Sequence, residues 1–313
     1  MPSIIDRQKT AVKGATLIVN TLSRRGEQWH ESAQRLLLDS GVEIESAHKL
    51  TRPKGLEPLI RDALDRGSQL IVVGGGDGTI RCAAGVLART EAALGVLPLG
   101  TVNDFARNLG IEPTLEAACK VIAGGKTAHV DLAQANGDYF VITASFGLSA
   151  LTQTVLSPPI KKLFGPFGYV LAALLAWRKL NHLHIQITHD GKTEEMKVMQ
   201  AGVINGHSWM GGKFEIPGVD LDSGRMAFYA VPPQTIWDYF RIARHVRLGE
   251  FFKTPGFRAF TTLEIYIKTR KPYPMVLDGD ICGKTPVTLK IVPEALRVCV
   301  PTEFLEVYGK QEA

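Results

Sequence analysis

The first part of the chain alternates short apolar runs with stretches of helical spacing. Apolar, often β-branched runs predict buried strands at Ala15–Asn20, Val42–Ala47, Gln69–Val73 and Leu94–Leu97. Apolar residues three or four positions apart predict helices at Trp29–Leu38, Leu56–Arg66, Thr79–Leu87 and Leu115–Ala123. Strands that alternate with helices are typical of a parallel sheet with helices on both faces. Residues 1–132 are therefore expected to form a three-layer α/β domain, which the C-terminal segment 301–313 could join.

After about residue 133 the spacing changes, and strand-like runs dominate. These runs lie at Tyr139–Ala144, His184–Thr188, Lys197–Ile204, Met226–Val231, Leu263–Lys268, Val287–Val292 and Arg297–Val300. Helical spacing appears only near 164–180 and 235–247. Short strands separated by turn residues predict an antiparallel, β-sandwich-like domain over residues 133–300. We expect the active site in the cleft between the two domains.

Composition limits the fold class, the kind of partner and the cellular compartment of the protein. At 313 residues with 45% hydrophobic and 21% charged residues, the chain is globular and long enough for two domains. A net charge of +5 suits acidic partners such as a nucleotide or an anionic membrane, although it is also an ordinary surface average. Four cysteines without a CxxC pair and without a preceding signal peptide favour a reducing cytoplasm.

The most informative segment is residues 71–79, Ile-Val-Val-Gly-Gly-Gly-Asp-Gly-Thr. Glycines after a buried strand allow a sharp turn that presents backbone N–H groups to an anion, which is usually phosphate. Asp77 would repel phosphate in such a turn unless it served a metal or a ribose. The spacing fits neither the P-loop nor the Rossmann dinucleotide pattern.

A second segment, Leu97–Arg107, places hydroxyl, amide and carboxylate side chains after a Pro-Leu-Gly turn and before a helix. One interpretation is an N-cap, in which Thr101, Asn103 or Asp104 binds the free N–H groups of that helix. Capping alone does not require so many polar residues beside a second glycine turn. Ligands of parallel sheets bind at the carboxyl ends of the strands, so this segment and Gly74–Thr79 are expected on one edge.

A third segment is Asp278-Gly279-Asp280, which follows a predicted strand in the second domain. Asp-Gly is a strong signal for a β-hairpin turn, and spacing alone favours that interpretation. The alternative is a carboxylate that acts as a general base.

Together these segments resemble the catalytic domain of the diacylglycerol kinase and sphingosine kinase superfamily, most closely the soluble bacterial lipid kinases. The resemblance covers nearly the whole chain and implies an NAD kinase-like fold for the first domain. It is carried by Asn20, Gly74–Thr79, Leu97–Arg107, Asp131-Leu132, Ser145-Phe146-Gly147, Gly211-Gly212, Asp220–Gly224 and Asp278-Gly279-Asp280. The Gly-Gly-Asp-Gly-Thr core is shared with NAD kinases, whereas the continuation Pro-Leu-Gly-Thr-x-Asn-Asp-Phe-Ala-Arg is specific to the lipid branch.

The resemblance implies a lipid kinase that uses Mg²⁺ to transfer the γ-phosphoryl group of ATP to a lipid hydroxyl. The acceptor would be a diacylglycerol-like lipid, phosphatidylglycerol or a sphingoid lipid, which suggests a role in phospholipid biosynthesis. By analogy, the nucleotide would be bound by Asn20, Thr51, Gly74, Gly75, Gly76, Asp77, Gly78, Thr79, Thr101, Asn103 and Asp104. Asp77 would lie beside Mg²⁺, whose charge offsets the repulsion from phosphate. Asp280 would accept the proton of the lipid hydroxyl, with Asp278 in support, so Asp280, Asp278 and Asp77 are the candidate catalytic residues.

Two departures from the family pattern matter. The family has Asp-Gly-Glu where this chain has Asp278-Gly279-Asp280, so the expected base is one methylene shorter. The bacterial relatives build a structural metal site around an Asp-Asp-Gly-Leu-Leu turn, which would make Asp220 and Asp222 metal ligands along with Asp77. Here Ser223 replaces the key carboxylate and Arg225 adds a cation, which argues against occupancy of that site.

As a lipid kinase the protein is expected in the cytoplasm, peripheral to the inner membrane face and in contact with its lipid substrate. Lys161, Lys162 and the arginine-rich stretch 241–247 are candidate contacts for anionic headgroups. No nucleic-acid module is recognisable, so no nucleic-acid partner is expected. The oligomeric state is open, with a homodimer as one option. Two alternative functions are a catalytically weak nucleotide- or lipid-sensing module and an NAD kinase-like enzyme.

Overall fold

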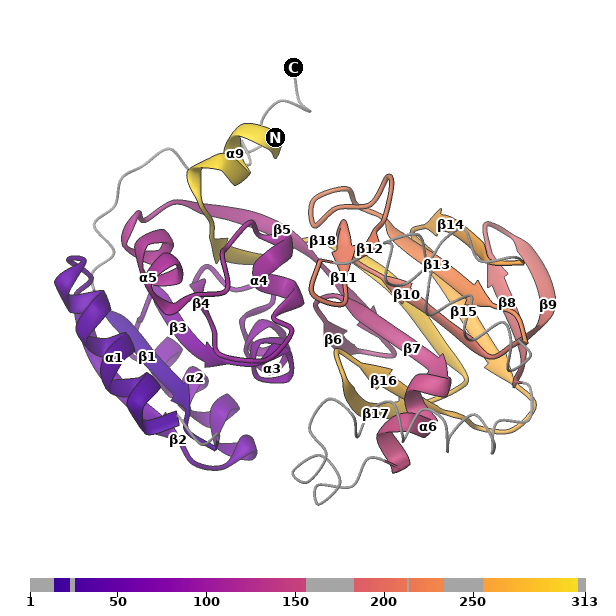
Figure 1. Ribbon diagram of the computed structural model, residues 1–313, viewed down its shortest axis with the longest axis horizontal. Helices are drawn as coiled ribbons and strands as arrows, with labels where there is room; N and C mark the ends of the chain where they lie inside the picture. The colour runs from indigo at the N-terminus through magenta and orange to yellow at the C-terminus, as the bar shows by residue number, and fades with distance from the viewer. Residues whose placement is uncertain (1–13, 23–25, 156–182, 213, 234–255, 309–313) are drawn as a thin grey trace. The chain divides into compact units, whose positions relative to one another are not determined.

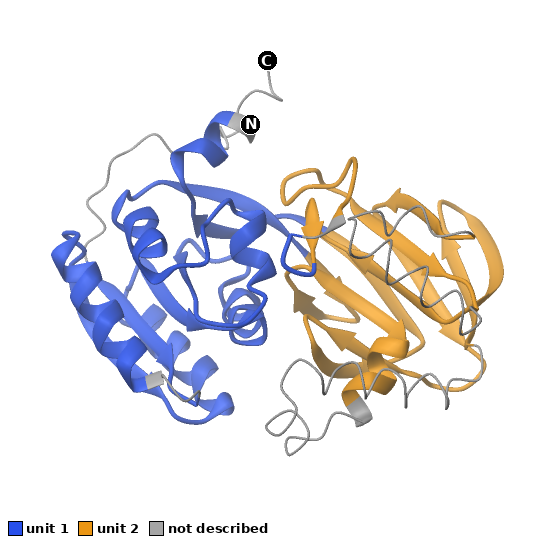
Figure 2. Ribbon diagram, viewed as in Figure 1, with its two compact units in different colours: residues 1–132, 210–212, 292–313 blue, residues 133–209, 213–291 orange. Residues whose placement is uncertain are grey.

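The computed structural model describes residues 14–22, 26–155, 183–212, 214–233 and 256–308. They form two compact units (Figure 2). Unit 1 contains the described residues of 1–132, 210–212 and 292–313, and unit 2 those of 133–209 and 213–291. The helices expected near 164–180 and 235–247, with the basic residues expected on them, lie outside the described residues. The domain boundaries and the position of the active site between domains stay predictions.

Unit 1 is built on a parallel sheet. Its strands are β1 (Ala15–Asn20), β2 (Ile44–Leu50), β3 (Leu70–Gly75) and β4 (Ala93–Pro98), in the order β2-β1-β3-β4 (Figure 1). The end of β18 (Val287–Cys299) continues this order in parallel, with Val298 opposite Leu94. Every residue of β3 and β4 is buried, which explains why the sequence shows continuous apolar runs there and no alternation.

Helices pack against this sheet in two pairs, α1 with α5 and α2 with α3 (Figure 1). The helices of unit 1 are α1 (Gly26–Asp39), α2 (Leu56–Asp65), α3 (Asp77–Leu87), α4 (Asp104–Asn108), α5 (Leu115–Ala123) and α9 (Thr302–Tyr308). A short 3₁₀ turn at Pro53–Gly55 precedes α2. The predicted α/β architecture with a parallel sheet is confirmed.

Unit 2 contains mostly antiparallel strands. They are β6 (Asp138–Phe140), β7 (Thr143–Gly147), β8 (Leu183–His189), β9 (Lys192–Val198), β10 (Gln200–Ile204), β11 (Ser208–Trp209), β12 (Phe214–Glu215), β13 (Met226–Val231), β14 (Arg258–Thr262), β15 (Glu264–Thr269), β16 (Pro274–Leu277) and β17 (Asp280–Lys284). One sheet has the order β14-β13-β10-β7-β16-β17, and the first part of β18 continues into β15, β8 and β9. Helix α6 (Leu148–Val155) follows β7.

The two sheets of unit 2 share one hydrophobic core. Phe146 and Phe228 of the first sheet and Ile187 and Ile267 of the second belong to the same cluster, and all four are fully buried. Burial of one face of each sheet is the arrangement of a β-sandwich. The predicted antiparallel, sandwich-like architecture is therefore confirmed.

Several predicted strands have different limits in the structure. The single strand predicted at Lys197–Ile204 is interrupted at Met199, between β9 and β10. The two strands predicted after residue 286 form one strand, β18, in which Glu294 has a positive φ of 51°. Strand β5 (Thr127–Ala135) was not predicted, because its polar and apolar residues do not alternate cleanly although most of them are buried. No helix among the described residues is long and apolar enough to cross a membrane.

Candidate functional site

The glycine-rich segment joins the end of β3 to the start of α3. Gly76 occupies the N-cap position of α3 in an extended conformation, and no side chain caps this end from that position. None of the glycines from 74 to 78 has a positive φ, so the turn does not require glycine for a left-handed backbone. Space is the reason at Gly75, where a Cβ atom would lie 2.6 Å from the Cβ atom of Thr79.

Glycine also allows this segment to contact the segment that follows β4. A Cβ atom on Gly100 would lie 2.6 Å from the Cα atom of Gly76. The Leu99 N–H donates to the Gly75 carbonyl at 2.9 Å. The two glycine turns are therefore packed backbone against backbone, which is the juxtaposition that the sequence predicts for the carboxyl edge of the sheet.

Asn20, at the end of β1, completes this edge. Its Nδ2 donates to the Thr79 hydroxyl at 3.0 Å, and its Oδ1 accepts the Leu22 N–H at 3.1 Å. The amide thus ties the first turn of α3 to the loop after β1. Two other predicted nucleotide residues, Thr51 and Thr101, are exposed in loops.

The Asp77 carboxylate binds the backbone of the second segment. It accepts the N–H of Asn103 at 3.0 Å and the N–H of Phe105 at 3.4 Å. Asn103 stands at the N-cap position of α4 with a φ of 54°, but its side chain makes no capping bond. Its amide instead binds Gly100, accepting the N–H at 2.8 Å and donating to the carbonyl at 3.0 Å. The capping predicted for Thr101, Asn103 or Asp104 is therefore supplied by Asp77.

Asp104 has a separate partner. Its side chain is only 8% exposed, and its carboxylate accepts the N–H groups of Met210 at 3.1 Å and Gly211 at 2.6 Å. Burial is the main reason that the pKa of Asp104 rises to about 6, and the charge of Asp77 raises it further. Burial also raises the pKa of Asp77, against the lowering effect of the N–H bonds from Phe105 and Asn103. Both acids at the glycine edge therefore have a raised pKa.

Asp278 of unit 2 also binds backbone N–H groups through its carboxylate. Its oxygens accept the N–H groups of Val141, Ile142 and Thr143 at 2.8 to 2.9 Å. Asp278 and Gly279 both have positive φ values and link β16 to β17, with Leu277 opposite Asp280. The hairpin interpretation of this segment is confirmed.

Asp280, the predicted base, is exposed and begins β17. Asp131, one of the residues that carry the family resemblance, is 2% exposed and accepts the Glu294 N–H at 2.9 Å. The contact is structural, because a buried acid needs hydrogen-bond donors.

The turn at 220–225 was the predicted structural metal site. The Asp220 carboxylate accepts the Leu221 N–H at 2.9 Å and a hydrogen bond from His207 Nδ1 at 3.1 Å. The Ser223 hydroxyl accepts the Asp220 N–H at 3.0 Å and donates to the Asp220 carbonyl at 2.9 Å. The Asp220 carboxylate is thus bonded to two N–H donors, and the Ser223 hydroxyl is bonded to the backbone of the turn. This arrangement does not match the set of oxygen ligands that a hard divalent cation requires. Among the described residues, no group of three His, Cys, Asp or Glu side chains could hold a metal ion.

Comparison with known proteins adds to this geometry. The model of the diacylglycerol kinase catalytic domain matches residues 14–135, and that of the YegS C-terminal NAD kinase beta sandwich-like domain matches residues 143–300. The diacylglycerol kinase of Bacillus subtilis (strain 168) is 30% identical over 302 residues, covering 94% of this chain and 99% of its own. That of Staphylococcus haemolyticus (strain JCSC1435) is 28% identical, with 93% and 89% covered. A crystal structure of a diacylglycerol kinase from Bacillus anthracis str. Sterne has a TM-score of 0.75 at 24% identity, covering 94% of this chain and 99% of its own.

Proposed function

We propose that this chain, which belongs to the diacylglycerol kinase family, transfers the γ-phosphoryl group of ATP to the hydroxyl group of a lipid. The observation that carries the proposal is the edge where Gly76 and Gly100 touch and Asp77 binds Asn103. Two strand ends and the start of a helix meet there, which is the arrangement that binds phosphate in α/β proteins. The relatives named diacylglycerol kinase support a lipid as the acceptor.

The start of α3 is suited to the phosphates of ATP. A helix N-terminus carries partial positive charge and exposed N–H groups, and Gly78 stands in its first turn. The Thr79 N–H is already bonded to the Gly76 carbonyl at 2.9 Å, so Thr79 would contribute through its hydroxyl. The Thr79 hydroxyl accepts the Asn20 amide, so its own proton is free to be donated to a phosphate oxygen. In this proposal Asn20 acts by fixing the orientation of that hydroxyl.

Asp77 fits a Mg²⁺ ion as a single carboxylate ligand. Its oxygens accept the N–H groups of Asn103 and Phe105, and a carboxylate has about four lone-pair sites in all. Mg²⁺ is usually held by one or two carboxylates together with substrate phosphates and water. When bound, it would neutralise charge that develops on the transferred phosphoryl group. Asp77 would hold it beside the start of α3.

Asp280 is the proposed acceptor of the lipid hydroxyl proton. It is exposed and stands on a hairpin whose turn is fixed by the three N–H bonds to Asp278. Asp278 is then a positioning residue, because its carboxylate is engaged by the backbone. A lipid substrate also implies contact with a membrane surface, and we propose a peripheral location on its cytoplasmic side.

The experiment is an assay of label transfer from γ-labelled ATP with Mg²⁺ to a panel of hydroxyl lipids. Diacylglycerol, phosphatidylglycerol and a sphingoid base should be offered separately in detergent micelles. The proposal predicts label in the lipid phase with at least one acceptor. A folded protein that binds ATP and labels no lipid would contradict it.

The shorter acid at 280 favours a second candidate, a nucleotide-binding module with little turnover. A misplacement of about 1 Å at a reacting group can reduce a rate by roughly a hundredfold. Under this alternative Asp280→Glu leaves turnover negligible, whereas a rise in turnover would identify a working site with an imperfect base.

A further inference from the structure

Strands β8, β9 and β15 of unit 2 carry a basic cavity that the proposed reaction does not use. Its volume is about 380 Å³, and the side chains that matter are His184, Gln186, Glu195, Lys197, Lys268 and Arg270. None of them belongs to the glycine-rich segments or to the hairpin at 278–280. A cavity of this volume is large enough for a small polar headgroup.

The strand register explains why cations gather there. Lys197 of β9 lies opposite His184 of β8, and Lys268 of β15 lies opposite Gln186 of β8. Side chains two apart on a strand point to the same face. Arg270 lies in the bend directly after β15 and also lines the cavity. Three permanent cations therefore line the cavity, one on β9, one on β15 and one just after β15.

Few negative charges lie close enough to neutralise these three cations. Within the part of the chain that the structure describes, Lys197, Lys268 and Arg270 form no ion pair, and all three are exposed. The one carboxylate of the lining, Glu195, accepts a hydrogen bond from Gln186 Nε2 at 3.2 Å. Like charges held on neighbouring strands repel one another, so an anion that enters the cavity is attracted by all three.

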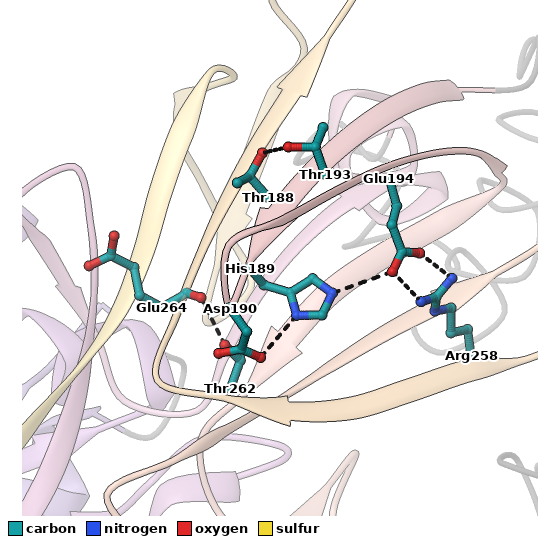
Figure 3. A network of polar contacts seen from close by, with 8 residues as sticks. All are labelled: Thr188, His189, Asp190, Thr193, Glu194, Arg258, Thr262 and Glu264. Carbon is teal, nitrogen blue, oxygen red and sulfur yellow. Dashed lines mark hydrogen bonds and ion pairs between the residues drawn. The ribbon is translucent and has the colours of Figure 1, made fainter.

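The opposite end of the β8–β9 hairpin shows a different arrangement (Figure 3). There Arg258 of β14 is paired with Glu194 at 2.7 Å, and His189 contacts Asp190 at 3.1 Å. The Thr188 and Thr193 hydroxyls are bonded across the strands at 3.0 Å. The Arg258–Glu194 pair holds the hairpin against β14, and the other two contacts lie within the hairpin. The cavity therefore lies on strands whose other end is fixed, which suits a preformed site.

We propose that this cavity binds a phosphate group, carried either by free phosphate or by the phosphoester headgroup of an anionic lipid. Arg270 can donate two parallel hydrogen bonds to phosphate oxygens, and Lys197 and Lys268 supply point charges. The proposal goes beyond the kinase reaction, since it needs no ATP and no turnover. For a protein that works at a lipid surface, such a site would add affinity for anionic membranes.

The test measures binding without ATP. Inorganic phosphate is titrated by calorimetry, and phosphatidylcholine vesicles with or without phosphatidic acid are used in sedimentation. The cavity variant is Lys197→Gln/Lys268→Gln/Arg270→Gln. The control variant, Lys192→Gln/Lys284→Gln/Lys290→Gln, removes the same charge from exposed lysines outside the lining. Melting temperatures establish that both variants are folded.

We expect the cavity variant to lose about a hundredfold in binding, at roughly fivefold for each cation, and the control to lose little. Glu195→Gln should strengthen binding by about fivefold, because it removes the only acid of the lining. Binding of inorganic phosphate identifies free phosphate as a ligand, and binding only to phosphatidic acid vesicles identifies the headgroup. No binding of either probe by the wild type, or equal losses in the two triple variants, would overturn the proposal.

Discussion

The Asp77 carboxylate accepts the backbone N–H of Asn103 at 3.0 Å, and this bond joins the starts of two helices. Asp77 is the first residue of α3, and Asn103 directly precedes α4. A carboxylate beside two helix N-termini is favourable to both helix dipoles. The acid of the glycine turn therefore has a structural role, and the proposed metal-binding role would be added to it.

Asp77→Asn is expected to lower the free energy of unfolding by about 1–3 kcal/mol, because an amide replaces part of the charged acceptor with a donor. Denaturant unfolding without nucleotide and without Mg²⁺ measures this loss. The control is Asp65→Asn, at an exposed acid that ends α2. Equal stability of the two variants, with only the Mg²⁺ dependence of ATP binding changed, would leave Asp77 with a metal role alone.

Gly100→Ala should separate the two glycine turns. The new Cβ atom would meet the Gly76 Cα atom at 2.6 Å and Asn103 Oδ1 at 2.7 Å. We expect a loss of about 1–3 kcal/mol in unfolding free energy, typical of overpacking, together with weaker ATP binding. Gly124→Ala is the control, since Gly124 has a helical φ of −62° and the nearest neighbour of the added carbon is the Val121 carbonyl oxygen at 3.2 Å. If both variants melt alike, the contact between the turns is not tight.

Much of the architecture could be predicted from the sequence, because the local spacing of apolar residues distinguishes strands from helices. Strand β1 and helix α5 have the predicted limits, since continuous burial and a Thr114 N-cap define them locally. The capping of α4 could not be predicted in this way. Its acceptor, Asp77, stands 26 positions before Asn103, and the local candidate turns its amide to Gly100. Contacts between loops that are distant in sequence are fixed only by the fold.

The same reasoning applies to the acids of the candidate site. The sequence predicted Asp77, Asp104 and Asp278 as catalytic or nucleotide-binding residues. The structure shows the carboxylate of each bound to backbone N–H groups. Their spacing gave no sign of these bonds, because each donor lies on a segment that pairs through tertiary structure.

Asp104 should make the stability of the protein depend on pH. Its pKa is about 6 in the folded protein and 3.8 for an ordinary aspartate, so between these values the folded state keeps a proton that the unfolded state has lost. The stability that this extra proton gives to the folded state is fully present below pH 3.8, and it is lost as the pH rises through about 6. The unfolding free energy of the wild type, relative to Asp104→Asn, should fall by at most about 3 kcal/mol between pH 4 and 7. A difference that does not change with pH would refute the buried-acid interpretation.

The turn at 220–225 should be insensitive to divalent cations. Ser223→Ala removes the hydroxyl that bonds both the N–H and the carbonyl of Asp220, and we expect a loss of about 0.5–1.5 kcal/mol. Melting curves with Mg²⁺ and with a chelator should coincide for the wild type and for this variant, in the absence of nucleotide. Ser40→Ala, at an exposed serine, serves as the control. Stabilisation of the wild type by Mg²⁺ that Asp220→Asn abolishes would show that the turn binds a cation after all.

The most direct test of the account is transfer of label from γ-labelled ATP to diacylglycerol by the wild type and by Asp280→Asn. Asp280 is exposed, and a melting curve establishes that the variant is folded. We predict labelled lipid with the wild type and a loss of roughly a hundredfold or more in the variant, as for removal of a general base. Absence of lipid labelling by folded, ATP-binding wild type, with phosphatidylglycerol and a sphingoid base also unlabelled, would contradict the claim that this protein is a lipid kinase.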